Sequence, residues 1–497
     1  MRKAKIIFID QVHAKIEGLD TVTLNRCIDK LKFMVPYRFH IASFRLGRWD
    51  GSIRFFEKSG KTYINLLPEV VPLIVQQGYE ITFDDRRPNF NIKIKEIDEN
   101  IFADHVWPKG HFKEGEPITL RSDQVYAANM FARNHYALQV LATGFGKTIL
   151  TAATCKVAED YGRSVVIVPS KSLVEQTYDD FKLVGMDVGR YYGDVKEIGH
   201  THTITTWQSL NELMTDRNKI DILAKMVDGV VQVLVDEAHQ CKSTVLNDIM
   251  TKIFPHVPLR RGFTGTIPKE PHDAKRIIAN IGEVVHRVTA KELQEKGILS
   301  RCHVMGLVTK DKKDFKSYDE ETAYLKKDTK RLEFVSELAN MVTERGNTLL
   351  LVNSVEAGKL LNDMIPGSKF VYGKTKVKER KSAYTNIQNS DNECIIATYQ
   401  VAAVGINIPR IFNLIMVEAG KSFVRVIQTI GRGVRVAKDK KFVQIYDLSS
   451  NSKFSKKHYK TRQEYYDEAQ YPYETFSGHY GEILNFVKES DEIDFSK

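Results

Sequence analysis

Short apolar, β-branched runs alternate with longer amphipathic stretches through most of this chain, and this alternation constrains its fold more than any other feature. The runs are YALQVL at 136–141, SVVIVP at 164–169, VVQVLVD at 230–236, TLLLVN at 348–353, ECIIAT at 393–398, NLIMVE at 413–418 and FVQIYDL at 442–448. Such alternation predicts parallel sheets covered by helices. Because the runs fall into two groups, we expect two α/β lobes, each with ligand sites at the carboxyl ends of its strands.

Three changes in local residue composition divide the 497 residues into four parts. A segment rich in turn formers at 107–117 separates an N-terminal unit from the rest, and a charged, lysine-rich passage at 310–331 follows the first group of strands. After Asp447 the strands give way to lysines and tyrosines. We expect an N-terminal accessory domain of α+β type at 1–112, lobes at 113–290 and 291–448, and a basic, aromatic tail of surface helix and loop at 449–497.

The composition favours a polyanionic partner. The formal net charge is +10, and a cationic surface gains affinity for nucleic acid by releasing condensed counterions. No apolar stretch is long enough to cross a bilayer, and Asp10 interrupts the only run near the start, so we expect neither a signal peptide nor a membrane partner. The five cysteines form no CxxC pair, which predicts a reduced, cytoplasmic protein, or one in the host cytoplasm if a phage encodes it.

The segment LATGFGKT at 141–148 has the context of a phosphate-binding loop, since it follows a predicted strand and opens a predicted helix. Its glycines allow backbone N–H groups to surround phosphates, its lysine can reach the β- and γ-oxygens, and its last hydroxyl can hold Mg²⁺. Leu141 stands where the general pattern has its first glycine, and a chance GKT in a turn is the alternative. The predicted ATP-binding residues here are Thr143, Gly144, Phe145, Gly146, Lys147 and Thr148.

The strand VVQVLVD ends in a DEAH sequence that suits phosphoryl transfer. Asp236 can anchor Mg²⁺, and Glu237 can accept a proton from the attacking water. His239 would then sense the γ-phosphate region. The alternative is a strand end with solvated acids.

The sequence QTIGRGVR at 428–435 places two arginines one helical turn apart. Arg432 and Arg435 can supply planar positive charge to a γ-phosphate, and Gln428 would share their face of the helix. Taken alone, the segment also fits a basic surface helix. Together with the phosphate loop and the DEAH sequence, it predicts an arginine finger.

In this order, the three segments resemble motifs I, II and VI of superfamily 2 helicases. The resemblance covers residues 115–448 and implies two RecA-like motor lobes that use ATP and Mg²⁺. It also implies adenine contacts by Arg121 and Gln124, a nucleotide neighbour at Gly405, and a motif III at Thr264, Gly265 and Thr266. Asn407 departs from the family pattern, which usually has aspartate there. The nucleic-acid contacts that the resemblance implies are Pro169, Ser170, Lys171, Thr206, Trp207, Gln208, Asn353 and Thr398.

The N-terminal sequence RLGRWDGSIR at 45–54 resembles the accessory domain of phage UvsW-type branch-migration helicases. It interleaves cations with aromatics, a composition that suits phosphate contacts and base stacking. We expect Arg45, Arg48, Trp49 and Arg54 to contact nucleic acid. The alternative is that Phe39, Trp49 and Phe55 fill the core of a small domain.

These features predict an ATP- and Mg²⁺-dependent DNA helicase that acts as a monomer on duplex or branched DNA, such as forks, Holliday junctions, D-loops or R-loops. Phosphate and sugar contacts imply low sequence specificity, and recombination or replication proteins are candidate partners. The alternatives are an RNA helicase, the motor subunit of a restriction or repair complex, and a nucleic-acid-binding scaffold that does not hydrolyse ATP. The lysines and tyrosines after Asp447 would either widen a basic track or form a helix that packs its tyrosines on the second lobe.

Overall fold

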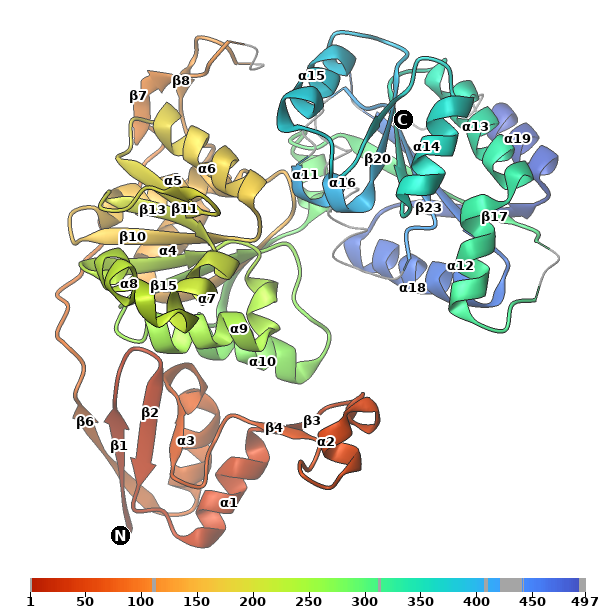
Figure 1. The fold of residues 1–497 in the computed structure, drawn as a ribbon. Coiled ribbons are helices and arrows are strands. Elements are labelled where there is room, and N and C mark those ends of the chain that lie inside the picture. Colours follow the sequence, from red (N-terminus) through yellow and green to blue (C-terminus); the bar gives the residue numbers. More distant parts are fainter. Residues whose placement is uncertain are drawn as a thin grey trace. The chain divides into compact units, whose positions relative to one another are not determined.

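The computed structural model describes residues 2–109, 113–311, 314–405, 410–420, 440 and 442–490. The chain divides into two compact units (Figure 1). One comprises Met1–Leu141 and Gly146–Arg287, and the other comprises Ala142–Phe145 and Val288–Lys497.

The first unit begins with a small α+β domain. Its elements are β1 (Arg2–Phe8), β2 (His13–Glu17), α1 (Thr21–Lys30), β5 (Lys61–Tyr63), η2 (Ile64–Leu66), α3 (Leu67–Gln76) and β6 (Tyr79–Asp85). The strand order is β5-β2-β1-β6, with β6 parallel to β1 and the other neighbours antiparallel. Alternation along β1 buries Ala4 and Ile6 while Lys3 and Lys5 stay exposed. The buried residues pack with side chains of α1 and α3.

A hairpin of β3 (Lys32–Met34) and β4 (Ser52–Arg54) projects from this domain (Figure 1). It carries η1 (Arg38–His40) and α2 (Ala42–Arg45), and we call residues 35–51 the knob. Gly51 closes the knob with a φ of +76°, and a Cβ there would lie 2.4 Å from Cδ of Arg38. The knob therefore requires glycine at this turn.

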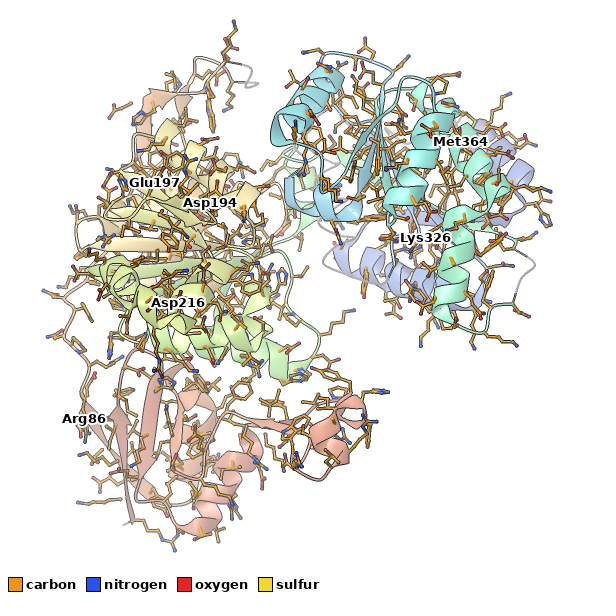
Figure 2. The ribbon with its side chains drawn as sticks, in the orientation of Figure 1. Arg86, Asp194, Glu197, Asp216, Lys326 and Met364 are labelled. Carbon is orange, nitrogen blue, oxygen red and sulfur yellow. The ribbon has the colours of Figure 1, made fainter. Side chains whose placement is uncertain are left out.

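After β6 the chain passes to the first lobe at Arg86, which Figure 2 labels. β7 (Phe102–Val106) pairs with β8 (Pro117–Ile118). The buried amide of Asn129 bonds both the N–H and the carbonyl of Ile97 at 2.8 Å. These bonds fix the connecting segment to the first lobe.

The first lobe is built on an eight-stranded sheet with the order β12-β11-β13-β10-β14-β15-β9-β16. The neighbours from β11 to β9 are parallel, so their carboxyl ends share one edge. The strands are β9 (Tyr136–Leu141), β10 (Arg163–Val168), β11 (Val188–Tyr192), β12 (Val195–Lys196), β13 (His202–Thr206), β14 (Val230–Val235), β15 (Leu259–Thr264) and β16 (Val284–Val288). The helices are α4 (Ser122–Arg133), α5 (Lys147–Ala158), α6 (Lys171–Leu183), α7 (Trp207–Thr215), η3 (Arg217–Lys219), α8 (Ile220–Val227), η4 (Ala238–Lys242), α9 (Thr244–Asp248), η5 (Ile249–Ile253) and α10 (Pro271–Asn280).

The described part of the second lobe forms a seven-stranded sheet with the order β19-β20-β18-β21-β22-β17-β23. All neighbouring strands in it are parallel. The strands are β17 (Arg301–Thr309), β18 (Thr348–Val352), β19 (Lys369–Val371), β20 (Cys394–Thr398), β21 (Asn413–Val417), β22 (Phe442–Ser450) and β23 (Tyr473–Gly478). The prediction of two α/β lobes with a small α+β domain is confirmed.

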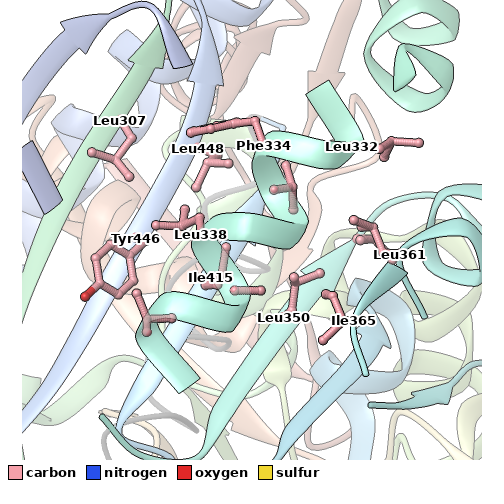
Figure 3. Packing of buried hydrophobic residues seen from close by; sticks show 14 of the residues in the cluster. Leu307, Leu332, Phe334, Leu338, Leu350, Leu361, Ile365, Ile415, Tyr446 and Leu448 are labelled. Atoms are coloured by element: carbon pink, nitrogen blue, oxygen red, sulfur yellow. The ribbon is translucent and has the colours of Figure 1, made fainter. Parts of the chain in front are cut away.

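Helix α13 (Thr329–Thr343) packs its apolar face on the second sheet (Figure 3). Leu338 of α13 is fully buried beside Leu350, Ile415 and Leu448 of three strands. The other helices among the described residues of this unit are α11 (Ala290–Glu295), α12 (Tyr318–Lys327), α14 (Val355–Met364), α15 (Val377–Gln388), α16 (Tyr399–Gly405), α18 (Lys453–Ala469) and α19 (Tyr480–Glu489).

The expectation of a surface tail after residue 448 is wrong. Strand β23 extends the second sheet by pairing with β17, and Ile483 and Val487 of α19 are fully buried in its core. Helix α18 exposes its lysines but buries Tyr459, Tyr465 and Tyr466, as the alternative of tyrosines packed on the lobe predicts. The lysine-rich composition reflected one face of an amphipathic helix.

Candidate functional site

The loop between β9 and α5 has the backbone of a phosphate-binding loop. Gly144 and Gly146 have φ values of +92° and +95°, which residues with a Cβ rarely adopt. Gly146 directly precedes the first turn of α5, which begins at Lys147. Thr143, Lys147 and Thr148 are partly exposed. The ring of Phe145 is fully buried, so this residue offers a ligand only its backbone.

Gln124 joins the predicted adenine-reading segment to this loop. A Cβ on Gly146 would lie 2.4 Å from Nε2 of Gln124, so the two residues pack closely. The side-chain oxygen of Gln124 accepts from the backbone N–H of Arg121 at 3.0 Å. Arg121 in turn pairs with Asp123, with Nε and Oδ1 3.0 Å apart. The first turn of α4 is therefore held beside the start of α5.

The DEAH sequence lies where β14 ends. The N–H of Asp236 still bonds the carbonyl of Ile167 at 2.9 Å, but Glu237 leaves the strand with a φ of +54°. Such a conformation is uncommon for a residue other than glycine and is enriched at functional sites. The pKa of Asp236 is raised to about 6, chiefly by burial and also by the charge of Glu237, while the charge of Lys147 opposes the rise.

His239 connects this segment to motif III. Its Nδ1 lies 3.2 Å from Oε2 of Glu237 and 3.2 Å from Oγ1 of Thr264, the last residue of β15. The Thr264 hydroxyl donates to the carbonyl of Thr266 at 2.7 Å. These contacts join the DEAH segment to the loop after β15.

Sequence reasoning missed two arginines in β15. Arg260 and Arg261 are fully buried, as is every other residue of the strand LRRGFT. Arg260 bonds backbone carbonyls, including that of Asn280 at 2.8 Å, and Arg261 bonds Gln232 and the carbonyl of Phe131. Burial lowers the pKa of each to about 10, so both stay charged at neutral pH. Consecutive arginines between apolar residues were the available signal.

The residues predicted to contact nucleic acid on the first lobe lie at the carboxyl ends of two neighbouring strands, β10 and β13. The hydroxyls of Ser170 and Thr206 cap α6 and α7, each accepting an N–H at 3.3 Å. Lys171 and Gln208, in the first turns of these helices, are exposed. Trp207 packs against the hydrophobic core, and Pro169 is partly buried before the cap of α6.

On the second lobe, Asn353 and Thr398 follow or end the neighbouring strands β18 and β20. Asn353 is exposed and donates to the backbone carbonyl of Glu418, whereas Thr398 is buried. Gly405 ends α16. The predicted finger residues Gln428, Arg432 and Arg435 lie outside the residues that the structure describes, as does Asn407.

The knob and its hairpin expose Arg45, Arg48 and Arg54. Trp49 is partly buried, and its Nε1 donates to the carbonyl of Ser52 at 2.8 Å. The rings of Tyr37 and Phe39 are 54% and 58% exposed, and the guanidinium of Arg38 lies 4.4 Å from the Phe39 ring centre. Of the three aromatic residues that were alternatives for the core, Phe55 is buried in the hydrophobic core of the N-terminal domain. Phe39 instead gives the knob an exposed ring beside its cations.

The donor set at the first lobe fits Mg²⁺. Thr148 and Asp236 offer hard oxygen donors, and Mg²⁺ typically takes one or two of these while phosphates and water complete its shell. The described residues contain no group of three or more His, Cys, Asp or Glu side chains that could hold a metal ion. In the same part of the chain, no helix is long and apolar enough to span a bilayer.

Three family models match the chain in succession. They are described as "DNA helicase UvsW, N-terminal" at residues 3–84, "Type III restriction enzyme, res subunit" at 117–269 and "Helicase conserved C-terminal domain" at 330–437. The ATP-dependent DNA helicase uvsW of Enterobacteria phage T4 is 23% identical over 493 residues, which cover 93% of each protein.

Two solved structures have similar lobes. S. cerevisiae Dbp5 bound to RNA and ADP BeF3 has a TM-score of 0.53 at 15% identity, covering 76% of this chain and 94% of that one. The DUF1998 helicase MrfA bound to DNA has a TM-score of 0.56 at 15% identity, covering 79% and 56%. The helicase models and the relative together define an ATP-hydrolysing helicase of superfamily 2. Within this class, the chain is a UvsW-like helicase.

Proposed function

We propose that this helicase uses ATP and Mg²⁺ to remodel branched DNA, such as forks, Holliday junctions, D-loops or R-loops. The observation that carries the proposal is the N-terminal domain, which matches the UvsW model and presents a knob with exposed arginines and aromatic rings. Cations bind phosphates and aromatic rings stack on unpaired bases, and a branch point offers both. We further propose that the protein acts as a monomer and that its DNA contacts are of low sequence specificity.

In the proposed mechanism, Gly144, Gly146 and Lys147 hold the ATP phosphates, and Arg121 and Gln124 read the adenine. Mg²⁺, held by Thr148 and Asp236, would neutralise charge on the phosphate oxygens. Glu237 orients the attacking water and accepts its proton.

From the sequence, Arg432 and Arg435 would supply positive charge to the γ-phosphate in the transition state. The residues at the strand ends, among them Lys171, Gln208 and Asn353, would hold the nucleic-acid backbone. Alternate closing and opening around ATP would then move these contacts along the strand.

ATP hydrolysis should be measured with single strands, duplex, a fork, a Holliday junction and RNA, following the product strands in the same samples. Strong stimulation by the fork or junction, with conversion of the branch, is the expected result. Stimulation by RNA alone would favour an RNA helicase. Stimulation by duplex without branch conversion would favour the motor of a restriction or repair complex, and absence of hydrolysis would favour a scaffold.

A further inference from the structure

Helix α10 contacts the DEAH segment on one side. It packs against η4, the short helix that begins at Ala238. Gly262 in β15 permits this approach, because a Cβ there would lie 2.9 Å from Cδ1 of Ile281 and 3.1 Å from Cβ of Ala238. Ile281 caps the carboxyl end of α10. The end of α10 and the DEAH segment therefore pack together over one glycine.

Buried polar bonds fix this end of α10. Asn280 is fully buried, and its amide donates to Oδ1 of Asn247 in α9 at 2.9 Å. Its carbonyl accepts from Nε of Arg260, which also donates to the carbonyl of Met250 at 2.9 Å. Each bond satisfies a group that would be costly to leave unpaired in the interior. Helix α10 is thus joined to the sheet and to the helices that follow η4.

The N-terminal domain holds the same helix from its other side. The amide of Asn65 donates to the carbonyls of Ile278 and Ala279, at 3.0 and 3.4 Å, in the last turn of α10. Glu69 pairs with Lys275 near the middle of α10, and both side chains are mostly buried. Ala279 is 1% exposed and belongs to the hydrophobic core of the N-terminal domain. That core is incomplete without a helix of the motor lobe.

We propose that Asn65 and Glu69 are positioning residues for ATP hydrolysis that act through α10. By holding α10 against η4, the N-terminal domain fixes the place of Glu237 and His239 relative to Thr264. Neither residue belongs to the nucleotide site. Their loss should therefore slow hydrolysis without weakening ATP binding, because the residues assigned to ATP binding lie at the start of α4 and on the loop and helix that follow β9, not on α10.

The Glu69–Lys275 pair permits a charge swap. Glu69→Lys and Lys275→Glu each set like charges together, and the double variant restores opposite charges. With saturating duplex DNA, each single variant should lower kcat for ATP about fivefold, the size expected for coupling through packed elements, with KM for ATP unchanged. The double variant should recover most of the lost kcat. Wild-type kcat in both single variants, or a double variant as slow as the single ones, would overturn the proposal.

Two further variants separate positioning from folding. Asn65→Ala removes the donor to α10, and it should lower kcat with KM unchanged while Tm stays within about 3 °C of wild type. The matched control reverses Arg133 and Glu96, an exposed pair 2.6 Å apart that joins α4 to the segment after β6, and should keep wild-type kcat. An equal loss of kcat in the control, or a raised KM with unchanged kcat in Asn65→Ala, would refute the role of α10.

Discussion

The carboxyl edges of the two sheets share a backbone feature but differ in the partners of their acidic side chains. Each has a glutamate with positive φ just after a central strand, Glu237 at +54° after β14 and Glu418 at +47° after β21. On the first edge, Glu237 neighbours Asp236 and His239, and Lys147 is the cation that acts on Asp236. On the second edge, Glu418 pairs with Arg331, a fully buried residue of α13.

Buried arginines of the same lobe neutralise the acidic side chains of the second edge. Arg462 of α18 donates from Nε and Nη2 to both oxygens of Asp447, at 2.8 and 2.9 Å, and from Nη1 to the carbonyl of Gly420 at 2.8 Å. Tyr466 adds a hydrogen bond to Asp447 at 2.7 Å. Carboxylates so bound are unavailable to Mg²⁺ or water. The difference supports our proposal that the first edge serves nucleotide chemistry, whereas the charges of the second edge hold the C-terminal helices.

Substitution of the two glutamates should have the largest effect and should affect the two lobes differently. Glu237→Gln should lower DNA-stimulated ATP hydrolysis about 10³-fold, because the amide cannot accept a proton from water. Lys147→Ala should abolish turnover as well, and both variants should keep the wild-type Tm. Glu418→Gln is the matched variant on the second edge, and it should lower Tm far more than its active-site counterpart while retaining most hydrolysis. Steady-state ATPase assays and thermal unfolding measure both quantities. Full turnover by Glu237→Gln would refute the assignment of the base.

The second expected effect concerns stability. Arg462→Met leaves the buried carboxylate of Asp447 without its cation, which should cost about 3–5 kcal/mol. Hydrogen exchange over β22, measured by mass spectrometry, should become faster, while ATP binding to the first lobe is unchanged. A second substitution, Asp447→Leu, removes the stranded charge and should recover part of the protection. Unchanged exchange in Arg462→Met would contradict the view that this ion pair stabilises the second lobe.

The sequence predicted the elements whose signals are local. Two patterns can each be recognised within about ten residues: a glycine-rich loop between a strand and a helix, and acids at the end of an apolar strand. The surface-tail prediction failed because the partners of α18 are distant in the chain, as Arg462 with Gly420 illustrates. Strand β23 also lacks a clean alternation of burial. Arg260 and Arg261 were missed for the same reason, since their acceptors are carbonyls that only the folded chain brings near.

The pKa of Asp236, raised to about 6, should make ATP hydrolysis depend on pH. Because burial raises this pKa, the carboxyl is protonated below about pH 6 and becomes available to Mg²⁺ as the pH rises through that value. At low Mg²⁺, kcat/KM for ATP should therefore fall as the pH drops below 6. Raising Mg²⁺ should move the inflection to lower pH, because the ion binds only the deprotonated form. A pH profile from 5 to 8 at two Mg²⁺ concentrations tests this, and an inflection that Mg²⁺ does not move would contradict it.

The smallest expected effect lies at Ser455, which helps close the second edge. Its hydroxyl donates to Glu321 at 2.7 Å and lies 3.1 Å from Oε2 of Glu418. Ser455→Ala should cost about 1–2 kcal/mol in the second lobe, since buried acceptors lose a donor. Hydrogen exchange at the start of α18 should rise slightly, and kcat for ATP should not change. If kcat fell while exchange stayed the same, Ser455 would take part in hydrolysis, and the view that it only stabilises the second lobe would be wrong.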